Sequence, residues 1–230
     1  MKFTVQAKAV EKIVRYAATR GVNIEPSIAN DPDDRIPFAQ LVDLYEKAAQ
    51  LTGEKNFGLH LAQSVDPKVF DVVGYSALNS STLGDAFARV ARYHSIWTDG
   101  ATFTLETSNE TSAIVYRYLD DTISEHRHDA EMTLATVTTL CRNIGSAEFT
   151  PTVVEFQHNT PADISEHQQL FRCPIKFNAR SNKLHFPSSY LSLPIEKAAE
   201  RISEISHPRQ PRCIIGTVTQ ISRAVSPRFV

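Results

Sequence analysis

The chain has 230 residues, of which 42% are hydrophobic and 22% are charged, and its net charge at pH 7 is -2. This composition is that of an ordinary globular protein with a sizeable core, and it excludes collagen, intrinsic disorder and a disulfide scaffold. Proteins that bind nucleic acid on their own usually carry a clear basic excess, which is missing here when the charge is averaged over the chain.

The cysteines and the N-terminus indicate the compartment. Cys141, Cys173 and Cys213 are far apart and have no CxxC spacing, which argues against a zinc knuckle or a disulfide framework and for a reducing environment. The first residues form no apolar signal-peptide core, and no stretch approaches the roughly 18 apolar residues that span a bilayer. We therefore expect a cytoplasmic protein with no membrane partner.

The first third of the sequence predicts helices. Apolar residues recur at helical spacing from Ala9 to Ala17, and Gly21 is a plausible end of that helix. After a polar break over 26–37, a strong amphipathic helix is predicted over 38–51 and a shorter one over 56–63. The longer of these helices carries on one face Leu41, Leu44, Tyr45 and Ala48.

The most informative predicted helix follows Thr82. Thr82 is suited to cap the first turn, and Asp85 complements the positive end of the helix dipole. The helix is expected to run to about Thr98, with Arg89 and Arg92 on its polar side. One apolar face collects Leu83, Ala86, Phe87, Val90, His94 and Trp97.

The rest of the chain mixes strands and helices. A hairpin is predicted from strands over 102–107 and 112–119. A long helix over 124–144, a shorter one over 161–170, and short strands over 152–157, 175–177 and 183–186 are also expected. This irregular order predicts an α+β fold, with a mixed, largely antiparallel sheet packed by several amphipathic helices. A break at 206–211 divides the chain into a domain over 1–205 and a linker or terminal extension over 206–230.

Sequence motifs for catalysis are missing. The chain has no GxSxG, GxGxxG or GxxxxGK[ST] motif, so we expect no enzyme, no glycine-loop nucleotide site and no cofactor. The segment 125–129 is the densest group of potential metal ligands. On a helix, His126 and His128 would point roughly 160° apart, so they cannot share one metal. His128 and Glu131 are better placed, but no second ligand pair has zinc spacing. We expect no metal, and a solvated or salt-bridged helix start, with the edge of a pocket as the alternative.

The helix over 83–97 carries the other candidate ligand-binding residues. A histidine within an apolar stripe is typical of a satisfied core residue, and Arg89 on the polar face is typical of a surface charge. Alternatively, His94, Tyr93 and Trp97 line a cavity, because an apolar wall with a few polar groups is what a small-ligand pocket needs. Our candidate set is therefore His94, Tyr93, Trp97, Arg89, His128 and Glu131.

Several segments, taken in order, resemble the "arabinose-binding" N-terminal domain of AraC-type bacterial transcription regulators. The resemblance covers roughly residues 10–200, and its most specific part is the stretch from Val72-Val73-Gly74-Tyr75 to Thr82-Leu83-Gly84-Asp85-Ala86 and on to Tyr93-His94. The other parts are Arg35-Ile36-Pro37, Phe57-Gly58-Leu59-His60, Arg127-His128 with Glu131, Phe171-Arg172-Cys173-Pro174, and Asn182-Lys183-Leu184-His185-Phe186.

The resemblance implies a bacterial sensory domain that binds a small-molecule effector and often forms a homodimer. In that family, DNA is bound by a C-terminal domain of about a hundred residues with two helix-turn-helix units. Only 36 residues follow Pro194 and none of them predicts a recognition helix, so we expect that domain to be absent from this chain. We therefore expect DNA contact only through the missing domain.

Two other functions compete with ligand sensing. A dimerisation module without a ligand predicts a filled core and an exposed apolar face on the helix over 38–51 or the helix over 124–144. An enzyme of an unfamiliar type would need a cluster of perturbed acids and bases in a cleft, and the sequence predicts none. Ligand sensing is the function that the sequence favours.

Overall fold

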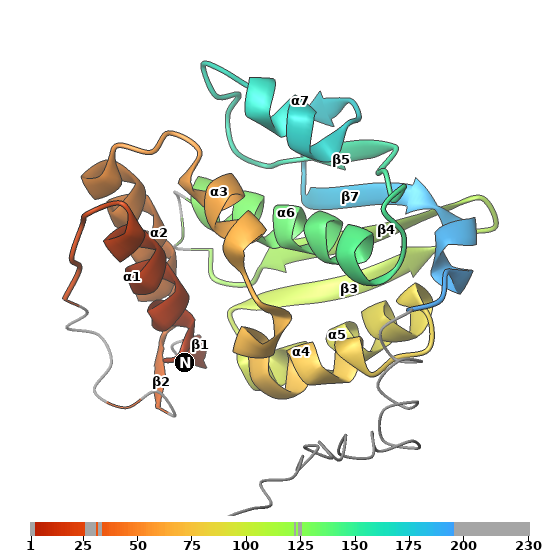
Figure 1. Ribbon diagram of the computed structural model, residues 1–230, viewed down its shortest axis with the longest axis horizontal. Coiled ribbons are helices and arrows are strands. Elements are labelled where there is room, and N and C mark those ends of the chain that lie inside the picture. Colours follow the sequence, from red (N-terminus) through yellow and green to blue (C-terminus); the bar gives the residue numbers. More distant parts are fainter. Residues whose placement is uncertain (1–2, 26–30, 32–33, 122, 124–125, 196–230) are drawn as a thin grey trace, which may run out of the picture.

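The computed structural model of the protein describes residues 3–25, 31, 34–121, 123 and 126–195 (Figure 1). Within these ranges, two β-sheets and seven α-helices form an α+β fold, as the sequence predicted. The expected boundary at residue 205, the extension over 206–230 and Cys213 all lie outside the described residues.

The N-terminal part pairs two short strands and packs three helices. Strand β1 (Thr4–Gln6) runs antiparallel to β2 (Arg35–Pro37), with Val5 opposite Ile36. The sequence did not predict these strands, because three residues are too few to display an alternating pattern. The helices are α1 (Ala9–Thr19), α2 (Phe38–Thr52) and α3 (Phe57–Ser64).

Two helices follow that lie side by side along one edge of the molecule (Figure 1). A short 3-10 turn, η1 (Pro67–Phe70), leads into α4 (Asp71–Leu78), and α5 (Leu83–Trp97) follows. Thr82 caps α5 as expected, because its Oγ1 accepts the Asp85 N–H at 3.2 Å.

The main sheet has the strand order β3-β4-β7-β5-β6. Neighbouring strands are antiparallel, except for the parallel pair of β5 and β6. The predicted hairpin is confirmed as β3 and β4, with Phe103 opposite Tyr116. The bounds are β3 (Ala101–Thr107), β4 (Thr111–Tyr118), β5 (Val153–Glu155), β6 (Ile175–Lys176) and β7 (Asn182–Pro187).

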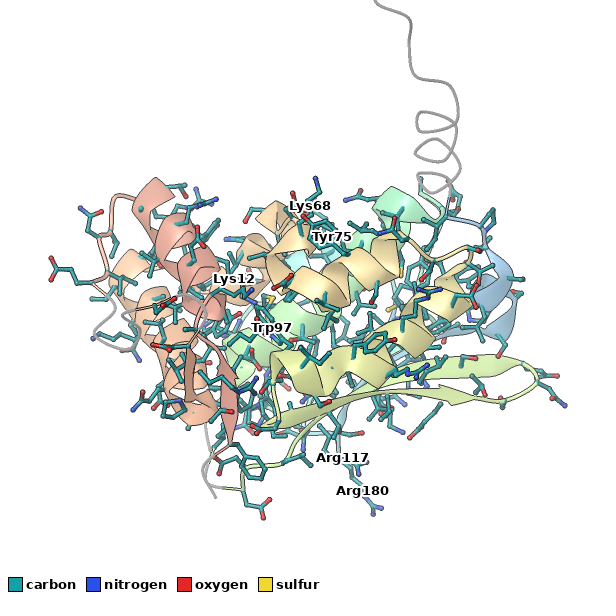
Figure 2. The ribbon with its side chains drawn as sticks, turned by 90° about the horizontal axis from the view of Figure 1, so that it is seen from below. Lys12, Lys68, Tyr75, Trp97, Arg117 and Arg180 are labelled. Carbon is teal, nitrogen blue, oxygen red and sulfur yellow. The ribbon has the colours of Figure 1, made fainter. Side chains whose placement is uncertain are left out.

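The two faces of this sheet differ in polarity. Period-two alternation places buried residues such as Ile114, Tyr116 and Leu184 on the face that helices cover. The other face carries charge, including the Lys183 Nζ–Glu106 Oε2 ion pair at 2.9 Å. Figure 2 shows Arg117 and Arg180 projecting away from the helices on this open side. The core therefore lies between the sheet and the helices.

Helix α6 (Arg127–Ile144) runs through the middle of this core and is buried on most sides. Gly58 lets α3 approach it closely, because a Cβ at that position would lie 2.2 Å from the His128 carbonyl oxygen. Of the two expected descriptions of the helix start, the salt-bridged one is confirmed and the solvated one is wrong: His128, Asp129 and Glu131 are 5%, 3% and 0% exposed, and Arg127 Nε pairs with Glu131 Oε1 at 2.8 Å.

The two remaining elements are α7 (Ser165–Phe171) and the 3-10 turn η2 (Ser188–Ser192). The predicted helix over 161–170 begins four residues too early. Asp163 lies before the helix, and its Oδ1 accepts the N–H of Ser165, the first helical residue, at 2.9 Å. Similarly, α6 begins at Arg127 and not at residue 124, and residues 124 and 125 lie outside the described part.

Candidate functional site

A cavity of about 140 Å³ lies between α5 and α6, roofed by α4 and closed by α1 and the sheet. Its lining is almost entirely apolar. Among the side chains that line it are Phe70, Phe87, Val90, Trp97, Phe103 and Val137. A volume of this size accommodates a small organic molecule, because an apolar cavity of about 150 Å³ holds benzene.

The cavity has a polar end and an apolar end. At one end, Lys12 of α1 lies beside Trp97 of α5 and Met132 of α6. At the other end, Leu83 at the start of α5 lies close to Gly145 at the end of α6. A Cβ added to Gly145 would lie only 3.0 Å from the Leu83 side chain. From Met132 to Ile144 the helix rises about 18 Å at 1.5 Å per residue. The cavity is therefore long and narrow, and polar groups gather at one end.

Lys12 is the buried cation of the polar end, and only 9% of it is exposed. Its ammonium lies 4.8 Å from the centre of the Phe70 ring, 5.7 Å from that of Tyr45 and 5.8 Å from that of Trp97. Burial lowers the pKa of Lys12 to about 8, against the opposing influence of Asp129. Figure 2 shows Lys12 and Trp97 close together, with Tyr75 and Lys68 at the outer side of the neighbouring elements.

Asp129 is the buried anion near that end. Its Oδ2 accepts hydroxyls from Tyr118 at 2.8 Å and Tyr116 at 3.0 Å. Burial raises the pKa of Asp129, while these two hydrogen bonds oppose the rise. Asp129 is thus held by the protein itself, whereas Lys12 is held by aromatic faces.

His94 lines the cavity from α5, about one turn before Trp97. Its ring stacks on Phe103 with centroids 6.0 Å apart and lies edge-on to Tyr116 at 6.3 Å. Burial lowers the pKa of His94 to about 4, so the imidazole is neutral at pH 7. A neutral imidazole has one donor and one acceptor, and because one ring nitrogen of His94 is hydrogen-bonded to the Ala101 backbone, the other nitrogen is left for a ligand.

The structure divides the six candidate residues into three pairs. Trp97 and His94 line the cavity. Arg89 is exposed on α5, and Tyr93 is partly buried against the core with the Arg92 guanidinium 5.5 Å from its ring centre. His128 and Glu131 lie in a separate polar cluster on the side of α6 that faces α3 and α7.

That second cluster surrounds the carboxylate of Glu131. Its Oε1 accepts from His167 Nε2 at 2.7 Å and from Arg127 Nε at 2.8 Å, and it lies 3.4 Å from His158 Nε2. Burial acts to raise the pKa of Glu131, but the bonds from His167 and Arg127 outweigh it and bring the pKa below its usual value. His128 Nδ1 lies 3.9 Å from Glu131 Oε2, and burial lowers the pKa of His128 to about 4.

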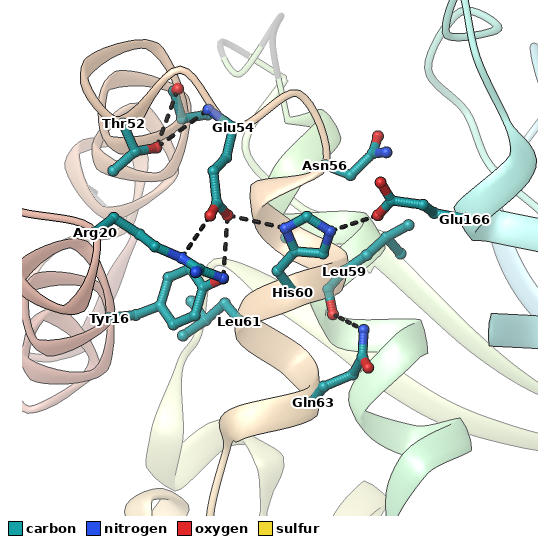
Figure 3. Close-up of polar contacts among 12 residues, drawn as sticks. Tyr16, Arg20, Thr52, Glu54, Asn56, Leu59, His60, Leu61, Gln63 and Glu166 are labelled. Carbon is teal, nitrogen blue, oxygen red and sulfur yellow. Dashed lines mark hydrogen bonds and ion pairs between the residues drawn. The ribbon is translucent and has the colours of Figure 1, made fainter. Parts of the chain in front are cut away.

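A neighbouring chain of polar contacts ties α1, α3 and α7 together (Figure 3). Arg20 Nε pairs with Glu54 Oε1 at 2.5 Å, and Glu54 Oε2 lies 2.9 Å from His60 Nδ1. The other ring nitrogen of His60 contacts Glu166 of α7. Burial lowers the pKa of His60, but the two carboxylates outweigh it and raise the pKa above its usual value. This arrangement is suited to joining helices.

The sequence analysis missed Lys12, Asp129, Phe70 and Tyr116 as cavity residues. One signal was available, because Lys12 lies three residues after Ala9 and four before Tyr16, on the face of α1 that also buries Ile13. A charged residue on such a face is a reason to expect a special environment. No local pattern marks Phe70, which reaches the cavity from a four-residue turn.

Burial raises the pKa of the Cys141 thiol, which lines the cavity, and that of Cys173 to about 11, so both thiols stay protonated at pH 7. Across the described residues, no group of three or more His, Cys, Asp and Glu side chains is arranged to hold a metal ion. No helix in the same ranges is long and apolar enough to cross a membrane.

Comparison with known proteins places the fold in a family. Residues 14–195 match the arabinose-binding domain of AraC transcription regulators, described as N-terminal. The chain is 23% identical over 188 residues to the ornithine utilization regulator of Pseudomonas aeruginosa, a match that covers 81% of this chain and 55% of that relative. The chain therefore spans about half the length of the curated relative it matches.

A solved structure has the same fold. The crystal structure of the transcriptional regulator CdpR from Pseudomonas aeruginosa superposes with a TM-score of 0.63 at 16% identity, covering 86% of this chain and 61% of that chain. At this identity the likeness concerns the fold alone. From the match over 182 of its residues, the chain belongs to the family of N-terminal arabinose-binding domains of AraC-type transcription regulators, a family of effector-binding regulatory domains.

Proposed function

We propose that this domain senses a small-molecule effector in the cavity between α5 and α6 and thereby controls DNA binding by a helix-turn-helix domain. The observation that carries the proposal is the cavity itself. Close packing leaves few voids in a protein core, so a space that is long, apolar and edged by a few polar groups is typical of a ligand site.

A route from the cavity to the end of the described domain supports the proposal. The N–H of Leu83, which lines the cavity, donates to the Leu193 carbonyl at 3.0 Å, and the Ile195 N–H donates to the Ser81 carbonyl at 3.1 Å. The first turn of α5 is thus paired with the last described residues. A ligand that shifts α5 would also shift the segment that leads to residue 196.

The expected surfaces of a ligand-free dimerisation module are not prominent. Helix α6 is buried on most sides, and the exposed positions of α2 are polar apart from Leu51, which is 52% exposed. Homodimer formation stays a proposal that accompanies ligand sensing. Because a bacterial transcription regulator acts where the DNA is, we propose a cytoplasmic location. We also propose that the domain has no enzymatic role.

A thermal-shift screen tests the proposal. The purified chain is screened against amino acids, sugars, fatty acids and aromatic acids. A ligand of the folded state raises its stability by about 2.7 kcal/mol at a hundredfold excess over the dissociation constant. We expect an upward shift with one chemical class.

A pair of variants shows whether the ligand occupies the cavity. Ala86→Leu adds volume to the cavity wall, and Ala88→Leu adds the same volume on an exposed position of the same helix. We expect Ala86→Leu to abolish the shift and Ala88→Leu to keep it. If no member of the panel shifts the melting temperature, the dimerisation module becomes the better description. If both variants keep the shift, the ligand binds elsewhere.

A further inference from the structure

Among the described residues, the buried ammonium of Lys12 has no oxygen partner. Its one hydrogen-bonding contact there is a weak one, with Met132 Sδ at 4.0 Å, and none of the described carboxylates forms an ion pair with it. An ammonium has three N–H donors, and aromatic faces attract its charge without accepting hydrogen bonds as oxygens do. The cation at the polar end of the cavity therefore lacks a strong acceptor.

A second polar group beside Lys12 is also unsatisfied. The Tyr45 side chain is 0% exposed, and its hydroxyl has no hydrogen-bond partner within the part of the chain that the structure describes. Buried polar groups are normally paired, and those that are not often mark a place for a ligand or an ordered water. Two donors thus gather where the cavity is polar.

The acid of this region is already engaged. Asp129 Oδ2 accepts from two tyrosine hydroxyls, so its need for donors is partly met by β4. The group at this end that most lacks a hydrogen-bond partner is the Lys12 ammonium, which has no strong acceptor among the described residues. The opposite end, formed by residues such as Leu83, Leu140 and Ile144, offers only apolar contacts.

We propose that the effector is a carboxylate with an extended apolar body, whose carboxylate binds Lys12 and whose body lies along α5 and α6 toward Leu83 and Ile144. This inference rests on the proposed function, because it names the chemical class of the ligand for the same cavity. A linear chain suits this cavity, because the cavity is narrow and is lined along α6 from Met132 to Ile144.

The probes are three molecules that share one carbon chain: octanoate, octanol and octylamine. Trp97 is the only tryptophan of the chain and lines the cavity beside Lys12, so its fluorescence reports binding directly. At pH 7 we expect octanoate to bind at least about tenfold more tightly than octanol or octylamine, since a charge-assisted hydrogen bond is lost in the latter two. Equal or tighter binding of octanol or octylamine would overturn the inference.

Lys12→Met tests the counter-ion. Methionine keeps most of the length of the side chain without its charge, and Lys47→Met makes the same change at an exposed position of α2. We expect Lys12→Met to remove the preference for octanoate over octanol, and Lys47→Met to keep it. If Lys12→Met binds octanoate as well as the natural chain does, Lys12 is not the counter-ion and the inference is wrong.

The natural chain provides a test that does not depend on a variant that folds. Lys12 has a pKa of about 8, and the titratable groups that face it are Asp129, Tyr45, Tyr116 and His94. The two tyrosines have a pKa well above 10 and His94 one of about 4, so neither kind titrates between pH 7 and 9.5. We expect the preference for octanoate over octanol to fall across this range, and an unchanged preference would contradict the inference.

The two proposals fail in different ways. In one outcome, octanol, octylamine or a compound of the screening panel binds in place of octanoate, and Ala86→Leu abolishes this binding. The proposal of a carboxylate ligand would then be wrong, while the proposal of ligand sensing would stand. If 2-aminooctanoate binds more tightly than octanoate, the ligand carries an ammonium group that pairs with Asp129. The effector would then be an amino acid, and the proposal of a simple carboxylic acid would be wrong. Absence of binding by all of these compounds would overturn both proposals.

Discussion

The two sides of α6 bury polar groups in opposite ways. Toward α3 and α7, Glu131 is surrounded by His167, Arg127 and His158, so its charge is met by the protein. Toward α5, Lys12 faces aromatic rings and an open cavity. A buried charge that is paired holds helices together, whereas one that lacks a partner is available to a ligand. We expect substitutions on the first side to act on stability, and those on the second side to act on binding.

The largest effect is expected for Glu131→Gln. The amide keeps the shape of the side chain but removes the charge that pairs with Arg127 and His167, and breaking a buried pair typically costs 3–5 kcal/mol, which we take as about 3 kcal/mol here. Urea unfolding at pH 7 measures the loss. Glu106→Gln, which breaks the ion pair with Lys183 on the open face of the sheet, is the control and should cost under about 1 kcal/mol. Equal costs would show that the Glu131 cluster is no more important than a surface pair.

For each pH unit, smaller effects are expected from two histidines, and the two act on stability in opposite directions. The pKa of His128 is about 4 in the folded chain against 6.5 in the unfolded one, so the unfolded state binds more protons and stability falls as the pH drops from 6.5 to 4. The limit is about 1.4 kcal/mol per pH unit. The pKa of His60 is raised instead, so its contribution is complete below pH 6.5 and is lost as the pH rises through its folded value.

Unfolding free energies measured at several pH values separate the two histidines. His128→Gln should reduce the loss of stability between pH 6.5 and 4 and leave the parts that His94, His126 and His158 contribute with the same sign. His60→Gln should flatten the decline above pH 6.5 and leave the acid side unchanged. A slope below pH 6.5 that His128→Gln does not alter would show that this imidazole titrates normally in the folded protein.

The smallest effect on stability is expected on the cavity side. His94→Leu replaces a neutral ring in contact with Phe103 by an apolar side chain, so we expect the free energy of unfolding at pH 7 to change by less than about 1.5 kcal/mol. Binding of the effector should weaken about tenfold, because a hydrogen-bonding group in the cavity is lost. Titration followed by Trp97 fluorescence measures this change. If the variant unfolds, His94 is a core residue and not a ligand-binding one.

Much of the fold could be predicted because its elements are periodic. The stripe from Leu83 to Trp97 gave α5 with its bounds, and the alternation around residues 102–119 gave the hairpin of β3 and β4. The β1–β2 pair, α4 and the start of α7 were missed or misplaced. Their signals are short, and the start of α7 depends on how Asp163 uses its side chain.

The site was less predictable for a physical reason. His94 and Trp97 could be proposed from one helix, because an apolar stripe implies that the helix faces something. Lys12 and Phe70 reach the same cavity from α1 and η1, and nothing in the local sequence places these elements beside α5. His128 and Glu131 are spaced as neighbours on a helix face, but only the packing of α7 reveals that the partner is His167.

The pairing of Thr82 with Pro194 has a mechanical consequence. Thr82 both caps α5 and forms a bridge with the strand-like segment that leaves the domain, while Leu83 in the next position lines the end of the cavity. The two residues Thr82 and Leu83 thus belong to the start of α5 and to the cavity wall, and they also contact the last described residues of the domain. We expect a movement of α5 to be passed on to residues 193–195, because these residues are hydrogen-bonded to the start of the helix.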